Sequence, residues 1–237
     1  MRARHRHLIF SSKALGASVS LYSPAISGKS NNDVIDSWSD LSGNANDATG
    51  TGTQRPTYKT AQLRGNPIVS FNGSTNALFG GKAANASTTN TFIGVGKITG
   101  ATGSPPKNIG IFCALYDSST NTDYFSAYYV NGTTWRLYNG SNFNCTASFS
   151  QSTYGVLRAI SNSTSSSIAV NGVSNTGNSG NLDSNNSNAY VLSRWPGGNQ
   201  YHQWDMAYCG VWGGSILSSS MLKRIESALS FTFAIKL

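Results

Sequence analysis

Short runs of alternating apolar and polar residues, separated by Gly, Asn and Ser, recur along the whole of this 237-residue chain. Such alternation turns one face of a β-strand toward a core and the other toward water. Residues 122–130 show the pattern, and Asn131-Gly132 joins them to a further run at residues 133–138. Asn-Gly between two such runs predicts a tight hairpin, because both turn positions favour a positive φ. About ten runs of this kind predict an all-β fold, a two-sheet antiparallel jelly-roll sandwich.

One short helix is expected at the C-terminal end of the sequence. Ser218 is a suitable N-cap for it. The apolar residues that follow at helical spacing, and so share one side, are Met221, Leu222, Ile225, Ala228 and Leu229. The charged residues Lys223, Arg224 and Glu226 are expected on the other, exposed side of this helix.

The polar residues 174–188 are expected to form one long loop within a single domain. The predicted organisation is a basic arm, residues 1–16, followed by one sandwich, residues 17–237. No apolar run approaches the roughly 20 residues that a membrane-spanning helix needs. The apolar stretch that follows the arm's basic residues is also too short for a signal peptide. The sequence therefore predicts no membrane as a partner.

Apart from the arm, most of the basic residues are scattered singly along the chain. The net charge is +8, but a nucleic-acid-binding surface is expected to gather basic residues on one element with interleaved aromatic rings. We therefore expect no nucleic acid as a partner. The arm combines basic with apolar residues, namely Arg2, Arg4, Arg6, Leu8, Ile9 and Phe10. Two interpretations of the arm stay open: a frayed, solvated end, or a segment that docks on an acidic surface of another chain.

The cysteine content indicates neither a disulfide framework nor a metal centre. Cys113, Cys145 and Cys209 are three in number, so at least one is unpaired within the chain. None has a second Cys or a His at metal-ligand spacing, and buried free thiols are expected. The sequence thus predicts no metal and no cofactor.

The supply of catalytic side chains is small. Glycoside hydrolysis usually needs two carboxylates placed across the scissile bond, but Glu226 is the only Glu and no two acids alternate on one strand face. His202 is the only His outside the arm, Asp205 stands alone, and no Gly-x-Ser-x-Gly motif is present. The sequence therefore predicts a protein that is not an enzyme.

An oxygen-rich loop runs from Asp40 to Asp47. It offers ligands of the kind that Ca²⁺ takes, six to eight oxygens in all, but it has only two carboxylates to offset the charge. Asp, Ser and Asn side chains also cap their own backbone in tight turns. We favour this second interpretation, with Trp38 anchoring the loop on the sandwich.

Two regions combine aromatic rings with amide or hydroxyl groups, as a saccharide site requires. The first is a Gly-rich loop with the candidate residues Arg194, Trp195, Asn199, Gln200 and Tyr201. The second is a strand face with Tyr124 and Tyr128. Strand tyrosines also commonly cover a sheet or fill a core. For the loop, saccharide binding and a purely structural role have equal weight. For the strand, a structural role of the tyrosines is favoured.

Three segments, in this order, carry a resemblance to a known family. The first is Trp38-Ser-Asp-Leu-Ser-Gly-Asn-Ala-Asn-Asp47, continued by residues 55–58 and 65–73. The second is the strand 167–173, which ends in Asn-Gly-Val, and the third is the strand 204–212 with the helix after it. Together they resemble the concanavalin A-like lectin/glucanase superfamily, in its laminin G-like branch of bacterial and phage type. Tyr208 stands where that family frequently has an acidic residue.

The resemblance implies a fold more than a function, because the superfamily includes lectins, glucanases and viral surface proteins. With no signal peptide, membrane span or catalytic set recognised, and with a polar surface and a basic arm, we expect a non-catalytic virion structural protein, a phage capsid decoration or fibre component at the virion surface. The alternative is a cell-surface or secreted carbohydrate-binding module, and a glycan-cleaving enzyme is the weakest interpretation. Expected partners are other virion or surface proteins, bound through the arm. Binding of host glycans and assembly into an oligomer are both compatible with this interpretation.

Overall fold

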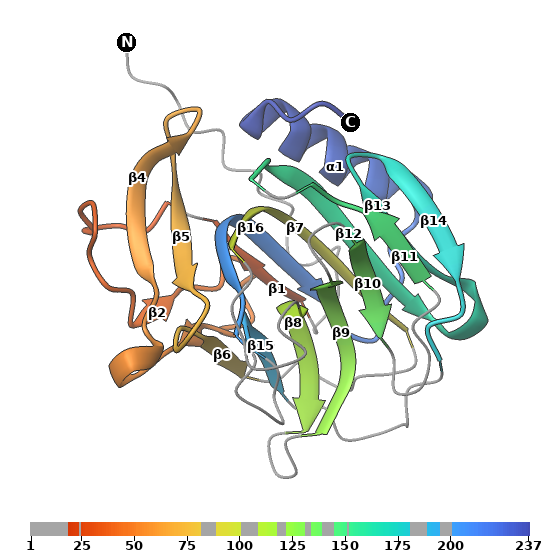
Figure 1. Ribbon diagram of the computed structural model, residues 1–237, viewed down its shortest axis with the longest axis horizontal. Helices are drawn as coiled ribbons and strands as arrows, with labels where there is room; N and C mark the ends of the chain where they lie inside the picture. The colour runs from red at the N-terminus through yellow and green to blue at the C-terminus, as the bar shows by residue number, and fades with distance from the viewer. Residues whose placement is uncertain are drawn as a thin grey trace.

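The computed structural model describes residues 19–23, 25–81, 89–100, 109–117, 122–130, 134–138, 145–150, 152–180, 189–194 and 201–237. In this part of the chain, sixteen strands form two antiparallel sheets that pack face to face, with one helix outside them (Figure 1). The two-sheet sandwich with one C-terminal helix is therefore confirmed. The strands outnumber those expected, because several span only two to four residues and are too short to show alternation.

Sheet A has eight strands, all antiparallel to their neighbours, and β1 pairs with the end of β16 beside β5. In spatial order they are β14 (Val173–Gly177), β13 (Ser166–Val170), β12 (Gly155–Asn162), β7 (Thr89–Gly100), β16 (Gln203–Trp212), β5 (Asn66–Asn72) and β4 (Thr57–Leu63), with β1 (Val19–Tyr22). Short 3-10 helices lie at Gly52–Gln54 and at Ser163–Ser165.

Sheet B also has eight antiparallel strands. In spatial order they are β11 (Cys145–Ser148), β10 (Thr134–Tyr138), β9 (Thr122–Val130), β8 (Ile109–Asp117), β15 (Ala189–Leu192), β6 (Leu78–Gly81), β3 (Ala48–Thr49) and β2 (Ser37–Trp38). Thr134 pairs with Val130, so β9 and β10 are paired antiparallel as the predicted hairpin requires, while the turn residues Asn131 and Gly132 lie outside the described residues.

The main core lies between the inner faces of the two sheets. Three tryptophans are among its largest side chains, and each of them is at most 1% exposed: Trp38, Trp135 and Trp204. Burying one such ring removes about 150–250 Å² from water, so each contributes strongly to the hydrophobic stabilisation. The three cysteines lie in the same core as buried free thiols, and burial raises the pKa of Cys145 to about 11.

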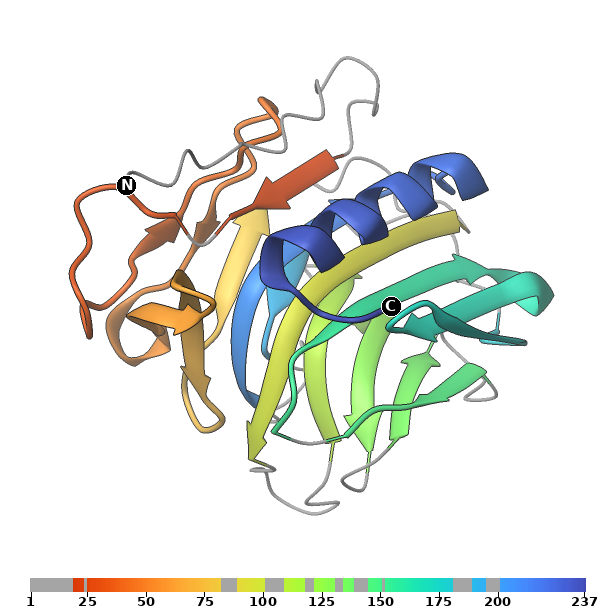
Figure 2. The same cartoon turned by 90° about the horizontal axis from the view of Figure 1, so that it is seen from above.

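Helix α1 (Ser219–Phe233) lies across the outer face of sheet A, where it covers a second apolar cluster (Figure 2). Ser218 caps its N-terminus by accepting a 3.3 Å hydrogen bond from the Met221 N–H, as the sequence predicts. Ala234 ends it in the left-handed conformation. Leu222, Ile225 and Leu229 pack against outward-facing residues of sheet A.

Two sequence predictions are wrong in detail. Glu226 is not on the exposed side of the helix but is buried. It lies four residues after Leu222 and three before Leu229, which places it on the buried face, and Arg158 of β12 offsets its charge. Residues 174–177 are not part of a loop either, since they form most of β14. This edge strand is exposed nearly throughout and so carries no apolar alternation.

The basic arm, with Arg2, Arg4, Arg6, Leu8, Ile9 and Phe10, lies outside the described residues. The division of the chain at residue 16 therefore stays a prediction. Within the described ranges, no helix combines the length and the apolar character that crossing a membrane would require.

Candidate functional site

The Gly-rich loop at residues 195–200 has a firmly held base. β15 ends in sheet B and β16 begins in sheet A, so the connection between them crosses from one sheet to the other. The His202 N–H donates to the Ser193 carbonyl at 3.0 Å, and the Ser193 hydroxyl donates to the His202 carbonyl at 2.8 Å. One residue further along, Arg194 and Tyr201 form an isolated antiparallel bridge. We call these four residues the loop stem.

Arg194 and Tyr201, two of the candidate residues, come together at the loop stem. The guanidinium carbon of Arg194 lies 5.5 Å from the centre of the Tyr201 ring. It also lies 5.8 Å from the centre of the Phe79 ring, which β6 supplies. Both distances fall within the range of cation–π attraction. The stem therefore holds one guanidinium group against two aromatic rings.

A third ring belongs to the same neighbourhood. Burial raises the pKa of the Tyr116 hydroxyl, and the positive charge of Arg194 partly opposes this shift. Sequence reasoning missed both Tyr116 and Phe79. Phe79 pairs with Val191 of β15, and Tyr116 of β8 pairs with Ala189 of the same strand. Only the order of strands β6, β15 and β8 brings these residues close to Arg194, and no local sequence signal reports that order.

The remaining candidate residues are only partly placed. Trp195, Asn199 and Gln200 lie outside the described residues. Strand β9 is described, and its register pairs Tyr128 with Arg136 of β10, but the side chains of Tyr124 and Tyr128 also lie outside the described part. β9 is separated from β15 by β8 alone. Both candidate regions therefore involve neighbouring parts of sheet B.

The Asp40–Asp47 loop is held by its own hydrogen bonds. Oδ1 of Asp40 accepts the N–H groups of Leu21 and Ser42, at 2.8 and 2.9 Å. Oδ2 accepts the Ser42 hydroxyl at 2.6 Å and the Asn46 N–H at 3.1 Å. The Tyr22 and Tyr190 hydroxyls both donate to the Asn46 carbonyl. A cation bound to Asp40 would have to displace these donors.

The possible metal ligands do not gather elsewhere in the described ranges either. Among those residues, no group of three or more His, Cys, Asp and Glu side chains lies close enough to hold an ion. Trp38, expected to anchor the Asp40–Asp47 loop, is 1% exposed and donates its indole N–H to the Ser23 carbonyl at 2.6 Å.

The three side chains considered for catalysis have three different sets of partners. Asp205 accepts the Ser70 hydroxyl at 2.7 Å and lies 3.5 Å from the ammonium group of Lys97. Glu226 accepts a 2.8 Å hydrogen bond from Arg158. Burial lowers the pKa of His202 to about 3, so its imidazole is neutral at pH 7. The carboxylates of Asp205 and Glu226 are each balanced by a cation, and the imidazole of His202 is packed against Trp204.

The fold is similar to solved structures of much longer proteins. Trypanosoma rangeli sialidase superimposes with a TM-score of 0.63 and 14% identity, over 92% of this chain and 33% of that one. The same sialidase in complex with sialic acid gives 0.62 and 14%, over 92% and 33%. The botulinum neurotoxin type G receptor-binding domain gives 0.56 and 11%, over 84% and 51%.

At 11–14% identity these similarities bear on the fold alone, and they confirm a concanavalin A-like sandwich. The chain spans about a third of the sialidase and about half of the toxin domain. No family model matches the sequence, and no curated protein matches it either.

Proposed function

We propose that this protein is a non-catalytic saccharide-binding sandwich and that the loop stem and its loop form the binding site. The observation that carries the proposal is the position of Arg194, whose guanidinium lies over the rings of Tyr201 and Phe79. A saccharide site needs flat apolar surfaces beside a few fixed polar groups. The rings supply the first and the guanidinium N–H donors supply the second.

The rigidity of the stem supports this assignment. Binding residues commonly lie on loops that a rigid scaffold positions, and here two hydrogen bonds and a bridge fix both ends of the loop. A side chain that is already ordered loses less conformational entropy when a ligand binds. Trp195, Asn199 and Gln200, on the loop itself, add a further ring and two amides in this proposal.

The absence of catalysis is part of the same proposal. It is supported by the separate partners of Asp205, Glu226 and His202, because glycoside hydrolysis needs two carboxylates facing one bond. A histidine with a pKa of about 3 is also poorly matched to general-base work at neutral pH.

Two of the similar structures suggest which ligands to test first. One is a sialidase in complex with sialic acid and the other is a receptor-binding domain. We therefore include sialylated and other acidic saccharides in the test, since a guanidinium group can pair with a carboxylate in a bidentate geometry.

The biological setting is a finer proposal, which rests on the sequence. We infer a member of the laminin G-like branch that serves as a virion structural protein, from the three ordered motifs and the basic arm. A cell-surface or secreted module is the alternative. Deletion of residues 1–10 is expected to abolish incorporation into a particle and to leave thermal unfolding unchanged. Incorporation that survives the deletion would contradict the docking arm.

A glycan array tests the proposed function. The wild type is expected to bind a defined set of saccharides, and Arg194→Ala is expected to lose them. Arg224→Ala is the matched control, because it removes an exposed guanidinium from helix α1, away from the loop stem. Equal binding by the wild type and Arg194→Ala, or no binding by the wild type, would refute the proposal.

A further inference from the structure

The outward side of helix α1 carries an aromatic ring that nothing in the described structure covers. The Phe231 side chain is 89% exposed, although the opposite side of the same helix is buried on sheet A. Lys223, Arg224 and Ser227 are exposed on this helix as well, and Lys236 follows shortly after its end. We call this surface the helix face.

The helix face has an uncompensated positive charge. Glu226 is the only acidic residue of α1, and it points into the structure, where Arg158 neutralises it. Among the described residues, no carboxylate lies within ion-pair distance of Lys223, Arg224 or Lys236. An exposed aromatic ring beside unpaired cations is typical of a protein-binding surface, in which one buried ring supplies most of the affinity.

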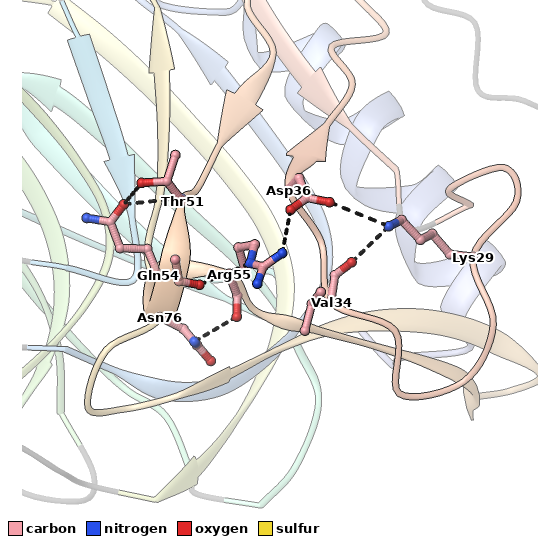
Figure 3. A network of polar contacts seen from close by, with 8 residues as sticks. Lys29, Val34, Asp36, Thr51, Gln54, Arg55 and Asn76 are labelled. Atoms are coloured by element: carbon pink, nitrogen blue, oxygen red, sulfur yellow. Dashed lines mark hydrogen bonds and ion pairs between the residues drawn. The ribbon is translucent and has the colours of Figure 1, made fainter.

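The same chain has a surface of opposite charge. Four of its nine acidic residues lie within residues 33–47, which contain no Lys or Arg. Asp36 is paired with Arg55 at 2.9 Å and with Lys29 at 3.9 Å, as Figure 3 shows. In the described part of the chain, no cation lies within ion-pair distance of the other three, which are Asp33, Asp40 and Asp47. We call residues 33–47 the acidic segment.

The acidic segment also exposes apolar side chains that could receive a ring. Leu41 is 57% exposed and Val34 is 43% exposed. Asp47, six residues after Leu41, is exposed as well. The acidic segment is thus complementary to the helix face. It carries negative charge, and it exposes aliphatic side chains next to that charge.

We propose that the helix face of one copy of this protein binds the acidic segment of a second copy. Phe231 packs on the exposed aliphatic side chains of the acidic segment, and Lys223 and Arg224 approach its carboxylates. The two surfaces lie apart on the molecule in both views (Figures 1 and 2). The contact is therefore head to tail, and a contact of this type builds a ring or a filament instead of a closed two-fold dimer.

The charge distribution argues against a symmetric contact between two helix faces, because that would bring like charges together. It also predicts how association responds to salt. At low ionic strength two copies with a net charge of +8 repel each other over a long distance. At about 150 mM salt the Debye length is only about 8 Å, so that repulsion is screened while charges in contact still attract. At about 1 M salt the contact pairs are weakened too. Association is therefore strongest at intermediate salt.

Sedimentation velocity of the full chain tests the proposal through two complementary variants. Phe231→Ala/Arg224→Glu disables the helix face, and Leu41→Ser/Asp47→Asn disables the acidic segment. Asn at position 47 keeps the oxygen that accepts the Asp40 N–H. Each variant alone is expected to associate at least tenfold more weakly than the wild type. An equimolar mixture is expected to form a dimer that does not grow, since each molecule keeps one intact surface.

Arg64→Glu is the matched control, because Arg64 is exposed but belongs to neither surface. It is expected to associate like the wild type, and circular dichroism confirms the fold of every variant. A wild type that stays monomeric at millimolar concentration and intermediate salt would overturn the proposal. So would a mixture of the two variants that stays monomeric, or a symmetric dimer that is lost only when the helix face is changed.

Discussion

The guanidinium of Arg158 donates a 2.8 Å hydrogen bond to the carboxylate of Glu226, and this pair joins strand β12 to the terminal helix. The two side chains are 12% and 8% exposed, so little solvent screens their interaction. Burial raises the pKa of Glu226, and the charge of Arg158 opposes that shift. A second guanidinium nitrogen of Arg158 donates to the Ser174 hydroxyl of β14 at 3.1 Å. One arginine therefore connects the helix with the edge of sheet A.

Glu226→Ala is predicted to lower the free energy of unfolding by about 3 kcal/mol, because it leaves the Arg158 charge buried without its partner. The double variant Arg158→Met/Glu226→Leu is predicted to cost less than about 1.5 kcal/mol, since it replaces the pair by apolar contacts. Urea unfolding followed by circular dichroism measures both. A loss below about 0.5 kcal/mol in Glu226→Ala would show that the pair does not hold the helix.

His202 makes the stability of the fold depend on pH. Its pKa is about 3 in the folded protein, against 6.5 as the ordinary value, so the unfolded chain binds the extra proton between these limits. The free energy of unfolding is therefore unaffected by protonation of His202 above about pH 6.5. It decreases as the pH falls below that value, by at most about 1.4 kcal/mol per pH unit.

Urea unfolding at several pH values between about 5 and 7 checks this prediction. His202→Gln is expected to flatten the slope, whatever its effect on stability at pH 7. Because the readout is a slope, a general loss of packing in the variant does not mimic the result. A slope that is the same in His202→Gln and in the wild type would contradict the account.

Asp40 is predicted to stabilise the fold without calcium. Asp40→Ala removes the acceptor of three backbone N–H groups and one hydroxyl, and is expected to lower the free energy of unfolding by about 2–4 kcal/mol. Thermal unfolding of the wild type is expected to be unchanged by millimolar Ca²⁺ or by EDTA. A melting temperature that rises with added Ca²⁺ would show instead that the loop binds this cation.

The sandwich is predictable from the sequence because its signals are local. Alternation, the Asn-Gly hairpin signal and the Ser218 cap each act within a few residues. The alternating strands and the cap are observed, and the strands on either side of Asn131-Gly132 pair with each other. Strands β2, β3 and β6 could not be predicted in this way, because alternation cannot be recognised in two to four residues. The polar edge strand β14 escapes it because neither of its faces is buried.

The candidate site was only partly predictable, for a different reason. Arg194 and Tyr201 lie seven positions apart and flank one loop, so the sequence alone groups them. Phe79 and Tyr116 reach the same place through the pairing of β6, β15 and β8, which are distant in sequence. Glu226 is a different case, because its spacing from Leu222 and Leu229 already places it on the buried face, and only its partner Arg158, 68 positions away, leaves no local signal. Contacts that depend on non-local pairing leave no periodic pattern.

The most direct test of the proposed function is a calorimetric titration of the wild type and Tyr201→Ala with the strongest saccharide from the array. Loss of a ring that stacks on the ligand is expected to weaken binding by about 1.4 kcal/mol or more, which is at least tenfold. Tyr201→Phe keeps the ring and is expected to stay within about threefold of the wild type. Phe231→Ala removes an exposed ring far from the stem and is expected to bind normally. Wild-type affinity in Tyr201→Ala would contradict the assignment of the saccharide to the loop stem.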